Sequence, residues 1–206
     1  MLKLMKGWVF CAKFWTGDSV SHPGIFEQTL ITGPAMKLFT ERKKQIIITL
    51  GIVCVNFFID RLAKVIAASF LAGKEPLILL KRLMIFTYVE NTGAFLGLGE
   101  GWNIFVKYCA LLIVPLLVCA VMIVYLALRE QSLFRIIAGS CIIGGGAGNL
   151  VDRLFNHFSV VDFMNFGIGP VRTGILNAAD ISVTFGAIAL LLYELRRNAA
   201  ARKTSG

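Results

Sequence analysis

The sequence predicts an all-α membrane protein with a small β element, made of four transmembrane helices and a short extracytoplasmic β-sheet. Hydrophobic residues make up 57% of the 206 residues, and the mean hydropathy is +0.75. Soluble domains are only about 45–50% apolar. Four apolar runs are each long enough to cross a bilayer, which takes about 20 residues. Two segments between these runs are rich in β-branched and aromatic residues, as strands are.

The four apolar runs set the predicted membrane topology. They span about residues 45–68, 103–128, 133–151 and 179–195. Basic residues cluster before the first run, between the second and third runs, and after the fourth. Four crossings place all three clusters on one side, and the positive-inside rule makes that side the cytoplasm. Both termini are therefore predicted to be cytoplasmic, with the segments 69–102 and 152–178 on the outer side.

The chain is interpreted as three parts. Residues 1–40 form a cytoplasmic extension, residues 41–198 the four-helix transmembrane domain, and residues 199–206 a cytoplasmic tail. The apolar stretch at the start of the extension is ended by Lys13 and is too short for a secretory signal peptide. Aromatic residues in the extension fit either a segment lying on the membrane surface or a disordered tail.

Charge and cysteine usage exclude two classes of function. The formal net charge is +9, but the basic residues follow the membrane topology, and no basic helix face interleaved with aromatic residues is present. Nucleic-acid binding is therefore not predicted. The five cysteines are scattered without a CxxC pair, so neither a disulfide framework nor a zinc site is indicated.

Turn signals and glycines place the shorter elements. Residues 83–89 and 160–166 are predicted strands, and the first leads into the turn signal Asn91-Thr-Gly93. The glycine- and proline-containing segment 167–174 predicts a loop before the last helix. Gly144 and Gly148 have GxxxG spacing without the Gly-Lys-Ser/Thr ending of a P-loop, so they predict close helix packing.

Several ionisable side chains lie in or beside the spans, where a charge costs about 2.5–3.5 kcal/mol or more at a helix centre. Asp60 and Lys64 are one helical turn apart, which predicts an ion pair. Asn149, Asp152 and Arg153 also cluster at helical spacing. Asp152 and Arg153 are predicted either to neutralise each other or to hold a neighbouring loop. Alternatively, this cluster could bind a substrate head group.

Asp162 and Asp180 differ from these residues because neither has a basic partner nearby in the sequence. Taken singly, Asp162 fits a solvated loop carboxylate. Asp180 fits a capping residue at the third helical position, with Asn177 as the N-cap. Taken together, they lie on a strand and a helix that return to the same membrane face, which can bring the two carboxylates close.

Two adjacent carboxylates cannot both ionise easily, so they share a proton and titrate as a unit. One then acts as general base on a water and the other as general acid to a scissile carbonyl. Asp180, near a helix N-terminus, is expected to be the more readily ionised partner. Other hydrolase sites are not indicated, because the sequence has no GxSxG elbow and only His157 lies near Asp162.

Five motifs, taken in order, resemble those of lipoprotein signal peptidases (signal peptidase II), and the resemblance covers residues 45–197. The motifs are Asp60-Arg-Leu-Ala-Lys64, Asn91-Thr-Gly-Ala-Phe95, Gly148-Asn-Leu-Val-Asp-Arg153, Val160-Val-Asp-Phe163 and Asn177-Ala-Ala-Asp180. The spacing of the last three motifs is specific. Two departures exist: residues 1–40 have no counterpart, and the second motif is one small residue shorter than the family pattern.

The resemblance implies an aspartic protease of the bacterial inner membrane, with four transmembrane helices and a small outer sheet. It removes the signal peptide from a prolipoprotein whose cysteine carries diacylglycerol, and the cyclic peptide globomycin inhibits it. Neither a metal nor another cofactor is expected, and a monomer is expected. The implied catalytic dyad is Asp162 and Asp180. The implied substrate-binding or supporting residues are Asn149, Arg153, Asn177, Asp60, Lys64, Asn91 and Asp152.

Two other classes of function fit the sequence less well. Buried aspartates also mark ion pathways in transporters, but four spans are few for a carrier and no inverted repeat is visible. A scaffold protein could use aspartates to join helices, but that leaves the lack of basic partners for Asp162 and Asp180 unexplained.

Overall fold

The computed structural model of the protein describes residues 34–94, 97–128 and 131–204. The chain divides into two units between Glu41 and Arg42, and the second unit is described here. The predicted extension 1–40 and Phe95 of the second motif lie wholly or mostly outside the described residues. Within the described residues, four helical stretches are long and apolar enough to cross a membrane: residues 38–71, 104–128, 133–155 and 178–203. All four predicted spans are thereby confirmed.

Three of the spans are continuous helices: α3 (Pro34–Leu71), α6 (Leu133–Phe155) and α7 (Ala178–Thr204). The second span is composite. It consists of α4 (Ile104–Lys107), a π-helical segment (Tyr108–Ile113) and α5 (Val114–Leu128). The N–H of Val114 donates to the carbonyl of Cys109, five residues back. Pro115 follows directly and has no N–H to donate, so the wider π turn ends where the helix must accommodate a proline.

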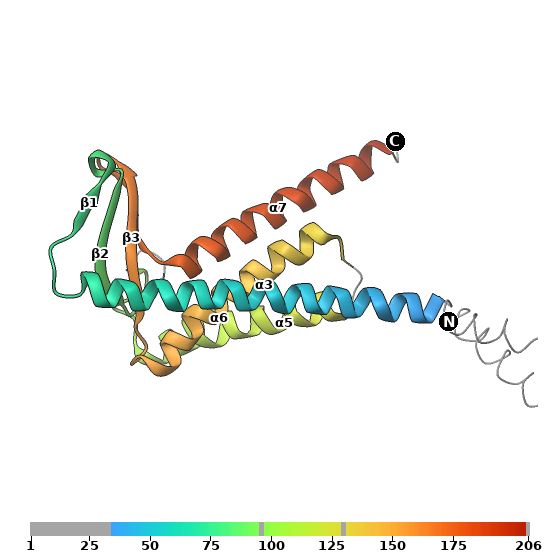
Figure 1. Cartoon of the computed structure of the whole chain (residues 1–206), viewed down its shortest axis with the longest axis horizontal. Helices are drawn as coiled ribbons and strands as arrows, with labels where there is room; N and C mark the ends of the chain where they lie inside the picture. The colour runs from blue at the N-terminus through green and yellow to red at the C-terminus, as the bar shows by residue number, and fades with distance from the viewer. Residues whose placement is uncertain (1–33, 95–96, 129–130, 205–206) are drawn as a thin grey trace, which may run out of the picture. The chain divides into compact units, whose positions relative to one another are not determined.

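A four-stranded antiparallel sheet crosses one end of the helices (Figure 1). Its strands, in spatial order, are β1 (Leu77–Leu79), β2 (Met84–Asn91), β3 (Val160–Ile168) and β4 (Val171–Leu176). The two predicted strands are β2 and β3. The predicted loop 167–174 is wrong in extent, because only Gly169 and Pro170 separate β3 from β4. The short strand β1 was not predicted.

Helix α6 is packed between α3 and α7 through glycines. A Cβ atom at Gly144 would lie 2.8 Å from the Cβ of Asn56 on α3, and one at Gly148 would lie 2.6 Å from Asp60 Oδ2. A Cβ at Gly145 would lie 2.5 Å from the carbonyl oxygen of Ala179 on α7. Such distances leave room only for hydrogen, so the predicted close helix packing is confirmed.

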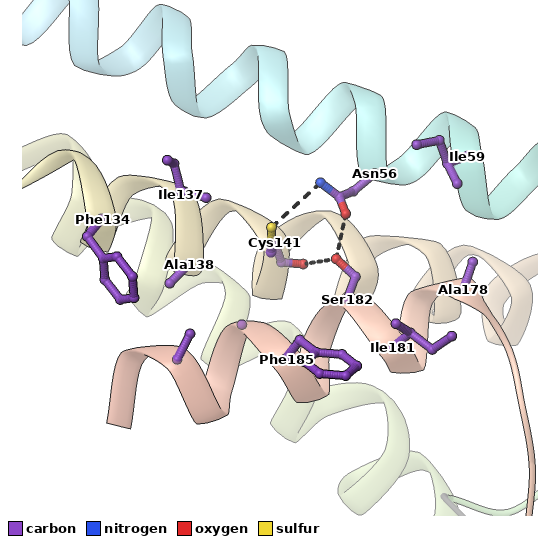
Figure 2. Close-up of a pocket in the computed structure, with 12 residues that line it drawn as sticks. Asn56, Ile59, Phe134, Ile137, Ala138, Cys141, Ala178, Ile181, Ser182 and Phe185 are labelled. Carbon is purple, nitrogen blue, oxygen red and sulfur yellow. Dashed lines mark hydrogen bonds between the residues drawn. The ribbon is translucent and has the colours of Figure 1, made fainter. Parts of the chain in front are cut away.

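Between the same three helices, Figure 2 shows a polar cluster at the edge of an apolar cavity of about 440 Å³. The Ser182 hydroxyl donates to Asn56 Oδ1 at 2.5 Å, and the Asn56 amide donates to the Ile52 carbonyl at 2.9 Å. The Ser182 hydroxyl also lies 3.1 Å from the carbonyl oxygen of Cys141 on α6. Asn56 therefore fixes α3 against α7 one turn before Asp60.

Substituting Gly145 with alanine is expected to lower the melting temperature in detergent, because the new methyl group would overlap the backbone oxygen of Ala179. Overpacking of this kind costs about 1–3 kcal/mol. The matched control is Gly51→Ala, since nothing lies within 4 Å of a Cβ at that position. Removing a mid-helix glycine stabilises by about 0.5–1 kcal/mol. Equal melting temperatures for the two variants would contradict the packing.

Candidate active site

Asp162 lies near the start of β3 and is buried, with only 3% of the residue exposed. Both of its carboxylate oxygens accept hydrogen bonds from amides. Asn91, the last residue of β2, donates to Oδ2 at 2.9 Å, and Asn177 donates to Oδ1 at 2.6 Å. Among the described residues, no cation lies within 4.0 Å of this carboxylate.

Asp180 lies in the first turn of α7, where it forms a reciprocal cap with Asn177. The Asp180 N–H donates to Asn177 Oδ1 at 2.9 Å, and the Asn177 N–H donates to Asp180 Oδ2 at 3.2 Å. The predicted N-cap is therefore confirmed. The other oxygen of Asp180 accepts from the Asn149 amide on α6 at 2.8 Å. This carboxylate also has no ion pair in the part of the chain that the structure describes.

Asn177 joins the two carboxylates. It is fully buried and sits between β4 and α7. Its amide group donates both to Asp162 Oδ1 and, at 3.1 Å, to Asn149 Oδ1. Asn149 in turn donates to Asp180. Strand β3 and helix α7 thus hold Asp162 and Asp180 against one asparagine, as expected from their places in the sequence.

The environment makes Asp162 hard to ionise. Burial and, to a lesser extent, the neighbouring Asp180 carboxylate together raise the pKa of Asp162 to about 6. Hydrogen bonds from Asn91 and Asn177 oppose this increase because they stabilise the charged form. The site therefore holds a carboxyl group that is protonated in mildly acidic conditions beside a second carboxyl group that caps a helix.

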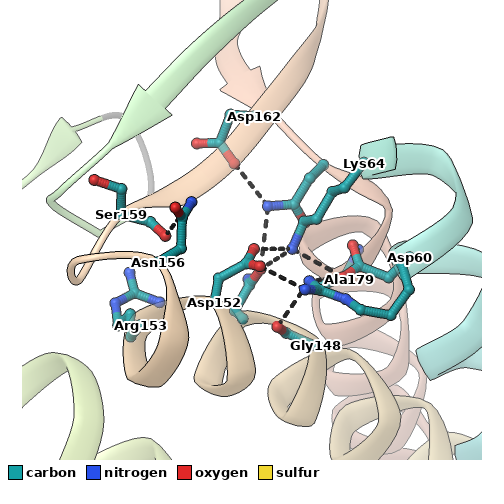
Figure 3. Close-up of polar contacts among 12 residues, drawn as sticks. Asp60, Lys64, Gly148, Asp152, Arg153, Asn156, Ser159, Asp162 and Ala179 are labelled. Atoms are coloured by element: carbon teal, nitrogen blue, oxygen red, sulfur yellow. Dashed lines mark hydrogen bonds and ion pairs between the residues drawn. The ribbon is translucent and has the colours of Figure 1, made fainter. Parts of the chain in front are cut away.

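A cluster of buried charges on α3 and α6 supports the pair of carboxylates (Figure 3). The Lys64 ammonium lies 2.8 Å from Asp60 Oδ2, 2.7 Å from Asp152 Oδ2 and 2.9 Å from Asn149 Oδ1. The predicted ion pair of Asp60 with Lys64 is confirmed. An ammonium has three donors, and all three are used. The contact with Asn149 turns its oxygen toward Lys64 and leaves its NH₂ group for Asp180.

Asp60 also positions the last helix directly. Its Oδ1 accepts the Ala179 N–H at 3.0 Å, and the residue has no exposed surface. A carboxylate at a helix N-terminus is favoured by the helix dipole and by the unpaired N–H groups there. The start of α7, and with it Asp180, is therefore fixed by a charge on α3.

Arg61 belongs to this cluster and was not among the predicted site residues. Its guanidinium lies 2.5 Å from Asp152 Oδ1 and 2.8 Å from Asp60 Oδ2, and it donates to the Gly148 carbonyl at 3.0 Å. The cluster therefore contains two positive charges, Lys64 and Arg61, for the two negative charges of Asp60 and Asp152. An arginine inside an apolar run is itself unusual, and that signal was available in the sequence.

Arg153 does not pair with Asp152, so that predicted alternative is wrong. Arg153 instead donates to the Gly93 carbonyl at 2.7 Å. The Gly93 N–H donates to Asn91 Oδ1 at 2.8 Å. The other predicted alternative is confirmed: Arg153 holds a neighbouring loop, the one that follows β2.

An apolar cavity of about 430 Å³ opens beside Asp180. Its walls come from the sheet and from α7. A substrate placed there would meet one carboxylate of the pair, two threonines and otherwise hydrocarbon side chains. The residues that line it are Phe166, Thr173, Leu176, Asp180, Ile181, Thr184 and Phe185.

Solved structures with this fold exist. One is described as a bacterial membrane enzyme determined by the in meso method at 2.3 Å resolution. It aligns with a TM-score of 0.63 and 25% sequence identity, over 77% of this chain and 91% of the other. A second, at 1.9 Å, aligns with a TM-score of 0.60 over 74% and 93% of the two chains.

Sequence comparison gives relatives of the same kind. The chain is 32% identical to a lipoprotein signal peptidase of Halothermothrix orenii, over 69% of this chain and 91% of that protein. It is 34% identical to one of Clostridium acetobutylicum, over 69% and 90%, and 30% identical to one of Borrelia duttonii, over 74% and 92%. The family model of signal peptidase (SPase) II matches residues 52–196. The chain therefore belongs to the signal peptidase II family and is a multi-pass membrane peptidase of that family.

Proposed function

We propose that the protein is an aspartic endopeptidase that removes the signal peptide from diacylglyceryl-modified prolipoproteins, cutting before the lipidated cysteine. The observation that carries the proposal is the pair of carboxylates, buried Asp162 and half-buried Asp180, joined through Asn177 without a contacting cation. A structural carboxylate at this depth is normally paired with a cation. Two unpaired carboxylates held together are the arrangement that acid–base hydrolysis requires.

The proposed mechanism divides the proton transfers between the two carboxyl groups. Asp180, which caps α7 near the helix N-terminus, is ionised and takes a proton from the attacking water. Protonated Asp162 donates its proton to the oxygen of the scissile carbonyl as the water adds. In the resulting diol, Asp180 returns its proton to the leaving amine, and Asp162 recovers a proton from a diol hydroxyl as the C–N bond breaks.

The surroundings of the pair fit a lipidated peptide. The cavity beside Asp180 is lined almost entirely by hydrocarbon, and α7 is one of the four membrane-spanning helices. Acyl chains can therefore reach the site without leaving an apolar medium, while the carboxylates lie where the helices meet the sheet. Asn91, Asn149, Asn177 and Arg153 are proposed to hold the pair and its loop, and Asp60, Lys64 and Asp152 to support them.

The remaining parts of the proposal follow the family and the charge pattern. The proposed protein is a monomer of the bacterial inner membrane, with both termini in the cytoplasm and the site at the outer face. Its proposed partners are the prolipoprotein carrying a diacylglyceryl cysteine, membrane lipid, and a globomycin-type inhibitor that occupies the pair. No cofactor is proposed, because the carboxyl pair activates the water itself. Nucleic acid is not a proposed partner.

A cleavage assay with purified protein tests the proposal. The substrate is a prolipoprotein with or without its diacylglyceryl group, and products are separated by gel shift and identified by mass spectrometry. We expect cleavage of the lipidated form only, with the lipidated cysteine as the new N-terminus. If the lipidated substrate stays intact where a known peptidase of the family cuts it, the proposal fails, and ion flux in proteoliposomes would be measured next.

The pH dependence of kcat/KM should report the proton on Asp162. Activity is expected to fall as the pH rises through about 6, because Asp162 must be protonated to act as the acid. The hydrogen bond from Asn91 lowers this pKa, so Asn91→Ala should move the alkaline limb to higher pH. Glu90→Gln, at the exposed neighbouring position, is the control and should leave the limb in place. A limb that moves to lower pH in Asn91→Ala would contradict the assignment.

A further inference from the structure

The outer edge of the sheet carries a segment that the proposed reaction does not use. We call residues Leu77–Leu83 the edge segment; it comprises β1 and the turn that follows it. Because β1 is the first strand in the spatial order, one side of its backbone is unpaired among the described residues. Exposed apolar edge strands are aggregation sites in water. Here the exposed fractions are 51% for Leu77, 49% for Ile78, 65% for Leu80 and 45% for Leu83.

The register of the sheet shows which way this edge faces. Leu79 is paired with Met84, and Met84 with Phe166, so these residues share one face of the sheet. Phe166 lines the cavity together with Asp180 and other side chains of α7. The face that carries Leu77 and Leu79 is therefore the one directed toward the membrane-spanning helices. Figure 1 shows β1 beside β2 in the sheet that crosses the helix ends.

The turn of the edge segment has a strained backbone and a positive charge. Leu80, Lys81 and Arg82 have φ angles of 49°, 52° and 71°. The left-handed region costs an L-residue about 1–2 kcal/mol. The turn is held in place by Arg172, which donates to the Arg82 carbonyl at 2.9 Å. Strain of this kind persists at sites where it serves a function.

The side chains of Lys81 and Arg82 are free to bind an anion. Both residues are exposed. Within the described ranges, no carboxylate lies within 4.0 Å of either one. Exposed leucines flank the two cations on both sides. Alternation of basic and apolar side chains at a membrane boundary matches a layer in which phosphates lie above acyl chains.

We propose that the edge segment binds anionic phospholipids. Its leucines enter the acyl region and cover the open edge of β1, while Lys81 and Arg82 contact lipid phosphates. Lysine and arginine stems can lie along apolar surface with their charges in the headgroup layer. Each basic residue at an anionic surface contributes about fivefold to the binding equilibrium. The segment thereby fixes the sheet at the depth where β3 presents Asp162.

Hydrogen–deuterium exchange of the full chain in nanodiscs tests this inference. The discs contain phosphatidylcholine alone or phosphatidylcholine with phosphatidylglycerol, and exchange is followed in peptides covering residues 77–83. We expect exchange there to slow by at least about fivefold in the anionic discs. Lys81→Gln/Arg82→Gln should lose this difference, and salt should weaken it in the parent. Exchange in β3 checks that the double variant is folded.

The matched control removes two basic residues from the other end of the bundle, Arg196→Gln/Lys203→Gln, and should keep the lipid dependence. Equal exchange of the edge segment in both kinds of disc would overturn the proposal. So would protection that appears only when a substrate peptide is added, since that result would assign the edge of β1 to strand addition by a peptide. Neither result depends on cleavage, so the assay separates this inference from the proposed activity.

Discussion

Asp162→Asn and Asp180→Asn are each expected to lower kcat/KM for cleavage of lipidated prolipoprotein by at least about 10³-fold. A positioned general acid or base contributes about 10²–10⁴-fold, and each residue performs two proton transfers in the proposed cycle. Because the pair acts as a unit, the double variant should be little worse than either single variant. Loss of activity in Asp180→Asn alone, with Asp162→Asn fully active, would falsify the shared-proton mechanism.

The same substitution at Asp162 is expected to stabilise the fold at neutral pH. The pKa of this carboxyl is about 6 in the folded protein and about 3.9 in an unfolded chain. The folded state therefore holds the proton more tightly, and stability falls as the pH rises from about 4 to about 6. Above that range the ionised group costs up to about 3 kcal/mol, from about 1.4 kcal/mol per pKa unit.

Asparagine at position 162 removes that cost because it never ionises. The melting temperature of Asp162→Asn in detergent should exceed that of the parent at pH 7.5, and the difference should disappear near pH 4. An inactive variant that is more stable than the parent cannot owe its inactivity to misfolding. Such an exchange of stability for activity is common at catalytic positions. A variant that is less stable than the parent at both pH values would indicate that Asp162 has a structural role instead.

Local contacts of the site could be predicted from the sequence because they lie within one helical turn. The cap between Asn177 and Asp180 and the ion pair between Asp60 and Lys64 follow from spacing alone. The contact of Arg61 with Asp152 joins residues 91 positions apart. Spacing carries no information about such a pair, since it depends on how closely α3 approaches α6. The glycine at position 148 permits that approach, but its partner on α3 is not visible in the pattern.

The sheet shows the same division between local and distant information. β2 and β3 were predicted because their own residues favour strands. β4 contains Gly174 and follows Gly169 and Pro170, which together indicate a loop. Pairing with β3 nevertheless draws Val171–Leu176 into the sheet. β1 has only three residues, too few for a period to be recognised. Tertiary pairing overrode local preference in both strands.

Lys64→Met is expected to destabilise the protein by about 3–5 kcal/mol, the usual cost of removing one partner from a buried ion pair. The side chain of Lys64 is only 5% exposed, and its ammonium contacts both Asp60 and Asp152. Without it, two buried carboxylates share the single guanidinium of Arg61. Arg61→Met is the comparison variant and should cost less, because the Arg61 side chain is 26% exposed and water can reach the charges it leaves. Melting temperatures in detergent measure both effects.

A second substitution separates the two roles of Lys64. Lys64→Met/Asp152→Asn removes one carboxylate with the ammonium, which restores the charge balance, so much of the lost thermal stability should return. Activity should stay below that of the parent, because Asn149 keeps only one of the two donors that hold its oxygen away from Asp180, the amide of Asn177. With this weaker hold on its amide, Asn149 can present its oxygen to the Asp180 carboxylate more often, which disfavours the ionised base. Recovery of stability together with full cleavage would show that Lys64 only balances charge. Recovery of stability alone would establish that it orients Asn149.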